Sequence, residues 1–277
     1  MKTIFTFILL LATITVFSQK NFQGKATYMS KTTMDMNRFG DKMSEQRKKQ
    51  IMSRMKNFLE KTYTLTFNKT ASSFKENVAL EAPGASGPSW GRGNGQGSIY
   101  KNTKDKKMIE DVEQFSKRFL IIESMEQPQW EMGVETKKIG DYTCYKATMT
   151  IEDKNIDWGG IFRRGSRAKK DSTDVKQEKP AKKMLSVTAW YTPQIPVSSG
   201  PDKYYGLPGL ILELNAGRTT MLCTEVAINT EDIVEITEPN KGKEVSREEY
   251  NEIIKVKTTE LKERFQNRGN RGGRGRF

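Results

Sequence analysis

The segment from Tyr191 to Asn215, YTPQIPVSSGPDKYYGLPGLILELN, constrains the fold more than any other part of the chain. It contains four of the nine prolines and is flanked by apolar runs. Proline fixes its own backbone and lacks an N–H donor, which excludes a helix, and the apolar flanks exclude a solvated linker. The segment therefore predicts a buried strand that enters a rigid, turn-rich corner and a second buried strand that leaves it.

The end of this corner has the residue pattern of a type II turn. In Leu207-Pro208-Gly209-Leu210, Pro208 suits the first central position, and Gly209 would supply the positive φ that the second position requires. Gly206, Pro208 and Gly209 are thus the predicted structural turn. Two interpretations of the corner remain open. It is a rigid part of the core, or it is a preformed rim for a ligand or partner, built from Trp190, Tyr191, Tyr204, Tyr205 and Leu207.

Alternation of apolar and polar residues predicts short strands along most of the chain. We expect them at 24–34, 63–67, 71–78, 98–109, 119–125, 130–136, 139–152, 185–192, 209–215 and 219–228. Short strands at even spacing favour antiparallel pairing, because an antiparallel pair needs only a tight turn between its strands.

Two segments predict helices. Between about 41 and 61, apolar residues recur at helical spacing with lysine and arginine between them. Residues 248–266 predict a C-terminal helix, with Ser246 as N-cap and Glu249 completing a capping box. The chain is therefore expected to have an α+β fold, a mainly antiparallel, curved β-sheet with the long helix (about 41–61) packed on it and the second helix at the C-terminus.

The N-terminus has the pattern of a secretory signal peptide over residues 1–18. Lys2 precedes an apolar run from Ile4 to Phe17, and Ser18 is the small residue that cleavage requires. The run is shorter than the roughly 20 residues of a membrane span, and no cysteine near the junction could carry a lipid anchor. We therefore expect an exported protein that is not lipid-anchored, in the periplasm, associated with the outer membrane or extracellular.

The mature chain has the length of one domain with additions. We expect a single domain over residues 19–267, with a flexible loop at 82–97 and a charged insert at 153–184. Residues 268–277 are rich in arginine and glycine and predict a disordered tail.

The two cysteines, Cys144 and Cys223, lie in predicted strands. In an oxidising compartment they could form a disulfide. Alternation places both on the less apolar face of their strands, which allows a bond without requiring one. A disulfide and two buried free thiols both remain open.

The formal net charge of +13 is concentrated in two segments. Residues 163–183 hold nine basic and three acidic residues, and residues 264–277 hold five arginines and no acidic residue. The rest of the chain is nearly neutral, and export argues against a nucleic-acid partner. The basic tail is either simply solvated or contacts an anionic surface of the cell envelope.

The absence of histidine from the sequence limits the catalytic chemistry that we expect. Histidine is the commonest general base and a usual ligand of catalytic zinc. No residue spacing singles out another catalytic group, so we predict no catalytic residues, no metal site and no cofactor. A pair of carboxylates from distant strands, as in glycosidases, remains the open route to catalysis.

Three blocks occur in a characteristic order along the chain: Lys138–Ala147 (KIGDYTCYKA), Thr188–Pro193 (TAWYTP) and Gly206–Ile211 (GLPGLI). In these blocks the chain resembles the GLPGLI family, a secreted or periplasmic family without an assigned reaction. The resemblance covers nearly all of the mature chain, but the charged insert and the Arg/Gly tail are not part of the family's pattern.

These observations predict a non-enzymatic envelope protein that binds or carries a hydrophobic ligand or an envelope component. One alternative is an accessory or assembly protein of an outer-membrane complex. A second alternative is a hydrolase that works without histidine. A deep apolar cavity would favour the carrier, a flat exposed aromatic patch the assembly role, and a cleft with close carboxylates the enzyme.

Overall fold

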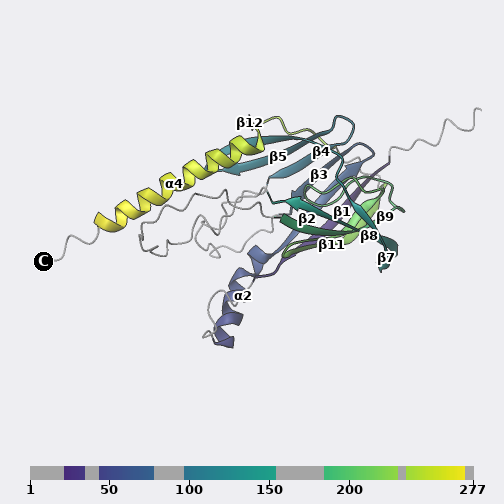
Figure 1. Ribbon diagram of the computed structural model, residues 1–277, viewed down its shortest axis with the longest axis horizontal. Helices are drawn as coiled ribbons and strands as arrows, with labels where there is room; N and C mark the ends of the chain where they lie inside the picture. Colours follow the sequence, from purple (N-terminus) through teal and green to yellow (C-terminus); the bar gives the residue numbers. More distant parts are fainter. Residues whose placement is uncertain (1–21, 35–43, 78–96, 154–183, 230–234, 272–277) are drawn as a thin grey trace, which may run out of the picture.

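The computed structural model describes residues 22–34, 44–77, 97–153, 184–229 and 235–271. Among these residues, twelve strands form one sheet in the order β12-β6-β5-β4-β3-β2-β1-β11-β10-β9-β8-β7 (Figure 1). The strands are β1 (Gln23–Thr32), β2 (Glu60–Asn68), β3 (Ala71–Glu76), β4 (Ser98–Asn102), β5 (Lys107–Gln114), β6 (Lys117–Ser124), β7 (Glu131–Ile139), β8 (Tyr142–Glu152), β9 (Met184–Thr192), β10 (Leu210–Ala216), β11 (Thr219–Ile228) and β12 (Lys243–Val245). The helices are α2 (Glu45–Leu59) and α4 (Arg247–Arg271).

Alternation of side chains gives the sheet one largely apolar face, which we call the inner face. In β1 and β2 the buried residues recur at every second position, and Ala26 lies opposite Leu65 and Tyr28 opposite Tyr63. The same face continues through Phe74 of β3. Because neighbouring strands present the same face at paired positions, one core cluster extends across the sheet from β5 to β8.

The expected α+β class is wrong, because the described residues form a mostly β structure. The sheet is mixed, since β12 pairs with β6 in parallel while the other pairings are antiparallel. The expected long helix over about 41–61, packed on the sheet, is not seen. Instead α2 ends at Leu59, where β2 begins, and projects away from the sheet, as Figure 1 shows.

The physical reason is that other segments occupy the inner face. None of the described side chains of α2 is buried. Part of the inner face is covered by the proline-rich corner (residues 193–209), whose Ile195, Val197 and Leu207 belong to the main core. Over β5 and β6 it is covered by the first turns of α4, through Tyr250 and Ile254.

The C-terminal helix is present and begins with the predicted capping box. The backbone N–H of Ser246 donates to Glu249 Oε2 at 2.8 Å, and the Glu249 N–H donates to Ser246 Oγ at 3.1 Å. The helix continues to Arg271, into the segment predicted to be a tail. No helix among the described residues combines the length and the apolar character that crossing a membrane requires.

Two strand predictions were wrong in detail. The single strand expected at 98–109 is the hairpin of β4 and β5, which turns at 103–106, and the short strand β12 was not expected. The predicted signal peptide lies outside the described residues. So do residues 82–96 of the predicted loop, 154–183 of the predicted insert and 272–277 of the predicted tail.

Candidate functional site

The proline-rich corner, residues 193–209, connects β9 to β10 and lies on the inner face of the sheet. Ile195 is fully buried, and its carbonyl accepts a hydrogen bond from the Leu210 N–H at 3.0 Å. The Ser199 carbonyl accepts from the Ile211 N–H at 3.1 Å. The hydroxyl of Tyr28, in β1, donates to the Ile211 carbonyl at 2.7 Å. The corner is therefore built into the core.

Hydrogen bonds between residues two apart shape the corner. They join Ile195 to Val197, Val197 to Ser199 and Leu207 to Gly209, each at 2.8 Å from carbonyl oxygen to amide nitrogen. Such three-residue turns keep the chain compact. The first of them and the last are centred on a proline, whose fixed φ suits an inverse γ-turn.

The predicted type II turn is wrong. Gly206 has the positive φ, at +94°, whereas Gly209 lies outside the left-handed region. Gly209 is required for a different reason: a Cβ built on it would lie 2.1 Å from the Thr192 carbonyl oxygen. The position is thus restricted by close backbone approach, not by its own dihedral angles.

Polar side chains on the inner face of the sheet form hydrogen bonds with the corner. The register places Ser72 of β3 opposite Lys101 of β4, and Lys101 opposite Met108 of β5. Ser72 Oγ lies 2.9 Å from Ser199 Oγ. The corner is therefore joined to strands β3 and β4, which are far from β9 in the sheet order.

Lys101 makes three hydrogen bonds to the corner. Its Nζ donates to the carbonyls of Gly200 at 2.6 Å, Asp202 at 2.7 Å and Tyr204 at 3.2 Å. The side chain is almost completely buried. Burial lowers the pKa of Lys101 to about 7, and the nearby Asp202 carboxylate partly opposes this. The three donors of an ammonium match the three carbonyls.

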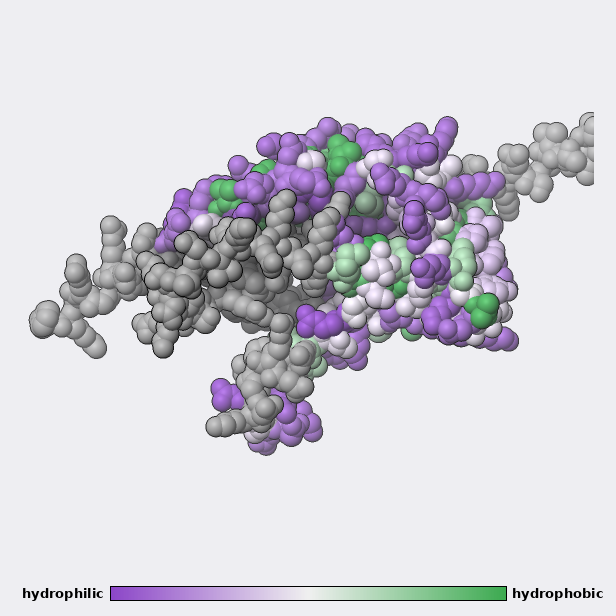
Figure 2. All heavy atoms as spheres, viewed as in Figure 1, coloured by the Kyte–Doolittle hydropathy of each residue, from purple (hydrophilic) through white to green (hydrophobic). Residues whose placement is uncertain are grey.

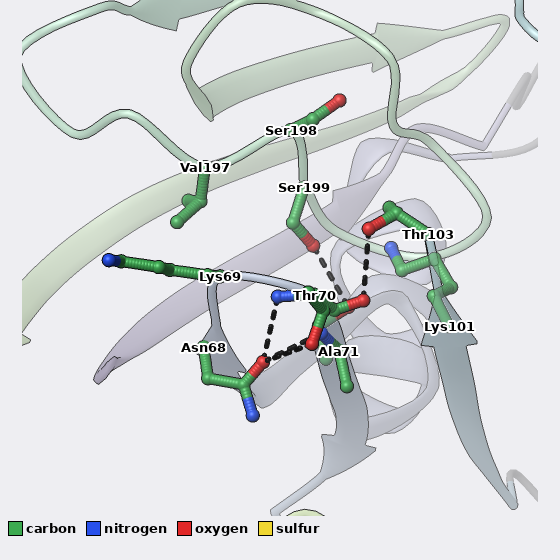
Figure 3. A pocket seen from close by; sticks show the side chains of 10 residues that line it. Asn68, Lys69, Thr70, Ala71, Lys101, Thr103, Val197, Ser198 and Ser199 are labelled. Atoms are coloured by element: carbon green, nitrogen blue, oxygen red, sulfur yellow. Dashed lines mark hydrogen bonds between the residues drawn. The ribbon is translucent and has the colours of Figure 1, made fainter. Parts of the chain in front are cut away.

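A small pocket lined mostly by polar residues opens beside this contact, as Figure 3 shows. It is lined by Asn68, Lys69, Thr70, Ala71, Ser72, Lys101, Thr103, Val197, Ser198 and Ser199. Many of its polar groups are already paired. Asn68 Oδ1 accepts from the N–H groups of Thr70 and Ala71, and the Thr70 carbonyl accepts from Thr103. The pocket is therefore mostly a by-product of hairpin turns packed against the corner.

An ionic cluster lies beside the corner, where α4 begins. The Arg247 guanidinium is buried and binds both Glu110 of β5 and, at 2.7 Å, Glu123 of β6. Lys203 of the corner also binds Glu110, at 3.1 Å. Burial would raise the pKa of Glu110, but Lys203 and Arg247 outweigh it and hold this pKa below its usual value.

We expect Arg247→Met to destabilise the protein by about 2–3 kcal/mol, because two partly buried carboxylates would lose their shared partner. In the natural protein Glu110 titrates below the usual carboxyl range, so its stabilising contribution is lost only on acidification through that low pKa. In the variant only Lys203 opposes the effect of burial, so the pKa of Glu110 is higher than in the natural protein and its protonation begins at a higher pH. The stability deficit should therefore shrink as pH falls from 7 to about 4.

Urea unfolding at several pH values measures this deficit. Arg218→Met, at an exposed arginine, is the matched control and should be nearly neutral. A deficit that stays constant with pH would show that Arg247 acts by packing alone.

The five residues predicted to form a binding rim do not lie on one surface. Tyr191 and Leu207 are buried in the core. Trp190 lies on the opposite face of the sheet, where Lys137 Nζ lies 4.3 Å from its ring centroid and 2.6 Å from Glu213. The register of β9 explains the separation, since Trp190 and Tyr191 are adjacent and point to opposite faces.

Tyr204 and Tyr205 form hydrogen bonds that stabilise the corner. The Tyr204 carbonyl is one of the acceptors for Lys101. The Tyr205 hydroxyl donates to the Glu126 carbonyl at 2.5 Å, and the Tyr205 carbonyl accepts from Trp130 Nε1 at 2.8 Å. These bonds attach the segment that leads into β7 to the corner.

Sequence reasoning missed an exposed apolar surface at the end of the sheet, which we call the hairpin patch. It consists of Met132 and Val134 of β7, which are 55% and 97% exposed, and Tyr145 of β8, which is 39% exposed. Met132 pairs with Ala147, so it lies on the inner face, and Val134 lies in the bulge between Met132 and Thr136. Figure 2 shows a hydrophobic spot at this end of the molecule.

The hairpin patch continues the apolar inner face to the edge of the sheet. The ring centroid of Tyr145 lies 6.1 Å from that of the buried Tyr191. β7 is the last strand in the order, so its second edge pairs with no strand among the described residues. Apolar residues in β7 were visible in the sequence, but only the strand order makes them an exposed edge.

Lys101 and Arg247 were also missed. The strand Ser98–Asn102 carried a signal, because alternation places Lys101 on the same face as the apolar Ile99. Arg247 carried none, since an arginine in the first turn of a helix is usually solvated.

Cys144 and Cys223 are both buried and not bonded to each other. Burial raises the pKa of Cys144 to about 11 and that of Cys223 to about 12, and the neighbouring Cys144 adds to the second shift. The two thiols are thus protonated and unreactive at neutral pH. Among the residues that the structure describes, no group of three or more acidic or cysteine side chains could hold a metal ion.

Comparison with known proteins gives a limited likeness. No curated protein matches the chain. A solved structure described as "Structure of PNGF-II in P21 space group" is 13% identical, with a TM-score of 0.46, and the match covers 84% of this chain and 33% of that one. A second, "Structure of PNGF-II in C2 space group", is 12% identical with a TM-score of 0.47, covering 86% and 33%. The chain spans about a third of the length of these proteins.

A family model matches the part of the chain that holds the corner and the hairpin patch. It covers residues 130–213, from the start of β7 into β10. The family is described as "Protein of unknown function (Porph_ging)", so this segment is similar to proteins without an assigned activity.

Proposed function

We propose that this protein is a non-catalytic binding module of the cell envelope that docks a protein partner through the hairpin patch. The observation that carries the proposal is the exposure of Met132 and Val134 on the edge strand β7. An edge strand offers unpaired backbone groups, and a partner strand can pair with them while its side chains cover the apolar ones. The partner would thus be an extended segment with apolar side chains.

The family assignment and the export of the protein belong to the same proposal. The GLPGLI block, Gly206–Ile211, lies within the segment that the family model matches. This supports the finer assignment to the GLPGLI family. Export rests on the signal-peptide pattern of residues 1–18.

The inner face lends less support to a carrier of hydrophobic ligands. A carrier of this architecture would hold its ligand against the apolar face of the sheet. In the described part of the chain, that face is occupied by Ile195, Val197 and Leu207 of the corner. A ligand there would have to displace packed core residues.

The ionic cluster lends little support to a hydrolase. Glu110 and Glu123 are brought together by one guanidinium. A general acid needs a raised pKa, whereas the pKa of Glu110 is lowered. The pair is arranged as an ion-pair network, which favours a structural role.

Site-specific photo-crosslinking in the protein's own cells tests the docking proposal. We expect a photoreactive phenylalanine analogue in place of Val134 to give one discrete crosslinked protein. The same analogue in place of Lys117, exposed on β6, is the matched control and should give none. Absence of a product at Val134, or the same product at both positions, would refute docking at the hairpin patch.

Native mass spectrometry of the protein purified from its envelope gives an independent reading. A bound protein would agree with the proposal, and a bound lipid without protein would favour the carrier. The same spectrum gives the mass of the N-terminus, and retention of residues 1–18 would contradict export with cleavage near Ser18.

A further inference from the structure

The helix α2 lies outside the core, and in the sequence it falls between the paired strands β1 and β2. β1 and β2 pair up to Lys31 and Glu60, and α2 lies between these strands in the sequence, directly before β2. Leu59 is the last residue of α2 and leads directly into β2, and Figure 1 shows the helix projecting from the body of the molecule. A helix in this position can approach a flat surface.

The residues of α2 are segregated around its axis. At about 100° per residue, an arc of about 100° holds Ile51, Met52, Met55 and Leu59, four of the five apolar residues in the helix. The opposite side holds the uncharged polar residues Gln46, Gln50 and Ser53. The helix is therefore amphipathic, although its apolar side has no buried residue among the described side chains.

Basic residues lie along both borders of the apolar arc. By the same helical geometry, Arg47 lies on one border, and Lys49 and Lys56 lie on the other. All three are exposed. Lys48 falls within the arc at the start of the helix, where it pairs with Glu45 at 2.7 Å. The helix as a whole has five basic residues and one acidic residue.

We propose that α2 binds the surface of an anionic lipid bilayer and lies in its interface. An apolar arc enters the boundary between headgroups and acyl chains, while lysine and arginine at its borders extend to the phosphate groups. The uncharged side then faces water. This proposal is independent of partner docking at β7, because it uses a different element and a different chemistry.

Co-sedimentation with lipid vesicles tests the proposal on the purified protein. The natural protein should bind vesicles of equal parts phosphatidylglycerol and phosphatidylcholine, and bind pure phosphatidylcholine far less. A double variant, Ile51→Ser with Met55→Ser, keeps every charge but removes apolar area, and its affinity should fall roughly tenfold. A second double variant, Lys49→Glu with Lys56→Glu, should also lose roughly tenfold or more.

The matched control is Gln46→Ser with Gln50→Ser, which makes the same number of serine substitutions on the uncharged side. It should bind as the natural protein does. All variants should keep the natural melting temperature, because no described side chain of α2 is buried.

The double serine variant separates α2 from the basic segments elsewhere in the chain. If it sediments with anionic vesicles as well as the natural protein does, the attraction comes from those segments and the proposal is wrong. Equal binding to neutral and anionic vesicles would also overturn it. A third result would overturn the proposal as well: the protein fails to bind vesicles, and α2 instead binds an acidic protein of the envelope.

Discussion

Gly209→Val is expected to cost at least about 3 kcal/mol or to prevent folding. A Cβ at this position would lie 2.1 Å from the Thr192 carbonyl oxygen and 2.8 Å from the Pro193 nitrogen. Both are backbone atoms at the start of the corner, so no side chain can move to make room. The chain must separate where β9 ends and β10 begins, and this disturbs the buried Leu210.

Gly140→Val is the matched control for the cost of glycine replacement itself. Gly140 has φ +56°, but a Cβ there would meet nothing within 4 Å. This variant should therefore lose about 1–2 kcal/mol, from left-handed backbone strain alone. Urea midpoints of the two variants measure the difference. Similar losses at both positions would mean that the close approach to Thr192 is not maintained in solution.

The wrong prediction of a type II turn at Gly209 shows how far a local sequence pattern predicts structure in this protein. The sequence Leu207-Pro208-Gly209-Leu210 has the composition of a type II turn, and composition is what local statistics record. The contact that decides the conformation is with Thr192, across the whole corner. Sequence could therefore predict a rigid corner between two strands, but not which glycine has the positive φ.

Most strands were predictable because alternation is a local property. β1 and β11, for example, were located to within about two residues. Strand order depends on contacts between residues far apart in the sequence, and it determines which strand lies at the edge of the sheet. β8 and β9 are paired although the predicted insert separates them in the chain, and β7 is left at the end of the sheet. Val134 is exposed in the bulge of this edge strand, and neither the bulge nor the edge can be read from local alternation.

The same limit explains the error over α2. Its amphipathic spacing is real, but spacing shows only that one side is apolar, not what that side meets. The expected partner was the sheet, yet the corner packs on the inner face through Val197 and Leu207. A proline-rich segment packs on this face instead of the helix. Hydrophobic periodicity cannot predict such packing, because the segment has no regular secondary structure.

Lys101→Met is expected to destabilise the protein by about 3 kcal/mol or more. Methionine fits the space of the lysine stem, but the carbonyls of Gly200, Asp202 and Tyr204 would lose their shared donor. A buried carbonyl without a donor costs about 1–3 kcal/mol. Relief of the buried charge offsets part of this sum. Chemical denaturation of the variant measures the loss, and Lys104→Met, at an exposed position in the β4–β5 turn, is the control.

The pH dependence of this loss distinguishes a buried ammonium from simple packing. Burial lowers the pKa of Lys101 from 10.5 to about 7. Between these values the unfolded chain binds the proton and the folded protein does not, so the natural protein gains stability as pH rises. The variant has no such group, and its deficit should therefore widen between pH 7 and 10. A deficit that does not change over this range would show that the three carbonyls keep Lys101 protonated. Lys101 would then stay charged at every pH where the protein is folded. Its ammonium group would bind the three carbonyls and keep the corner attached to β4 over that whole range.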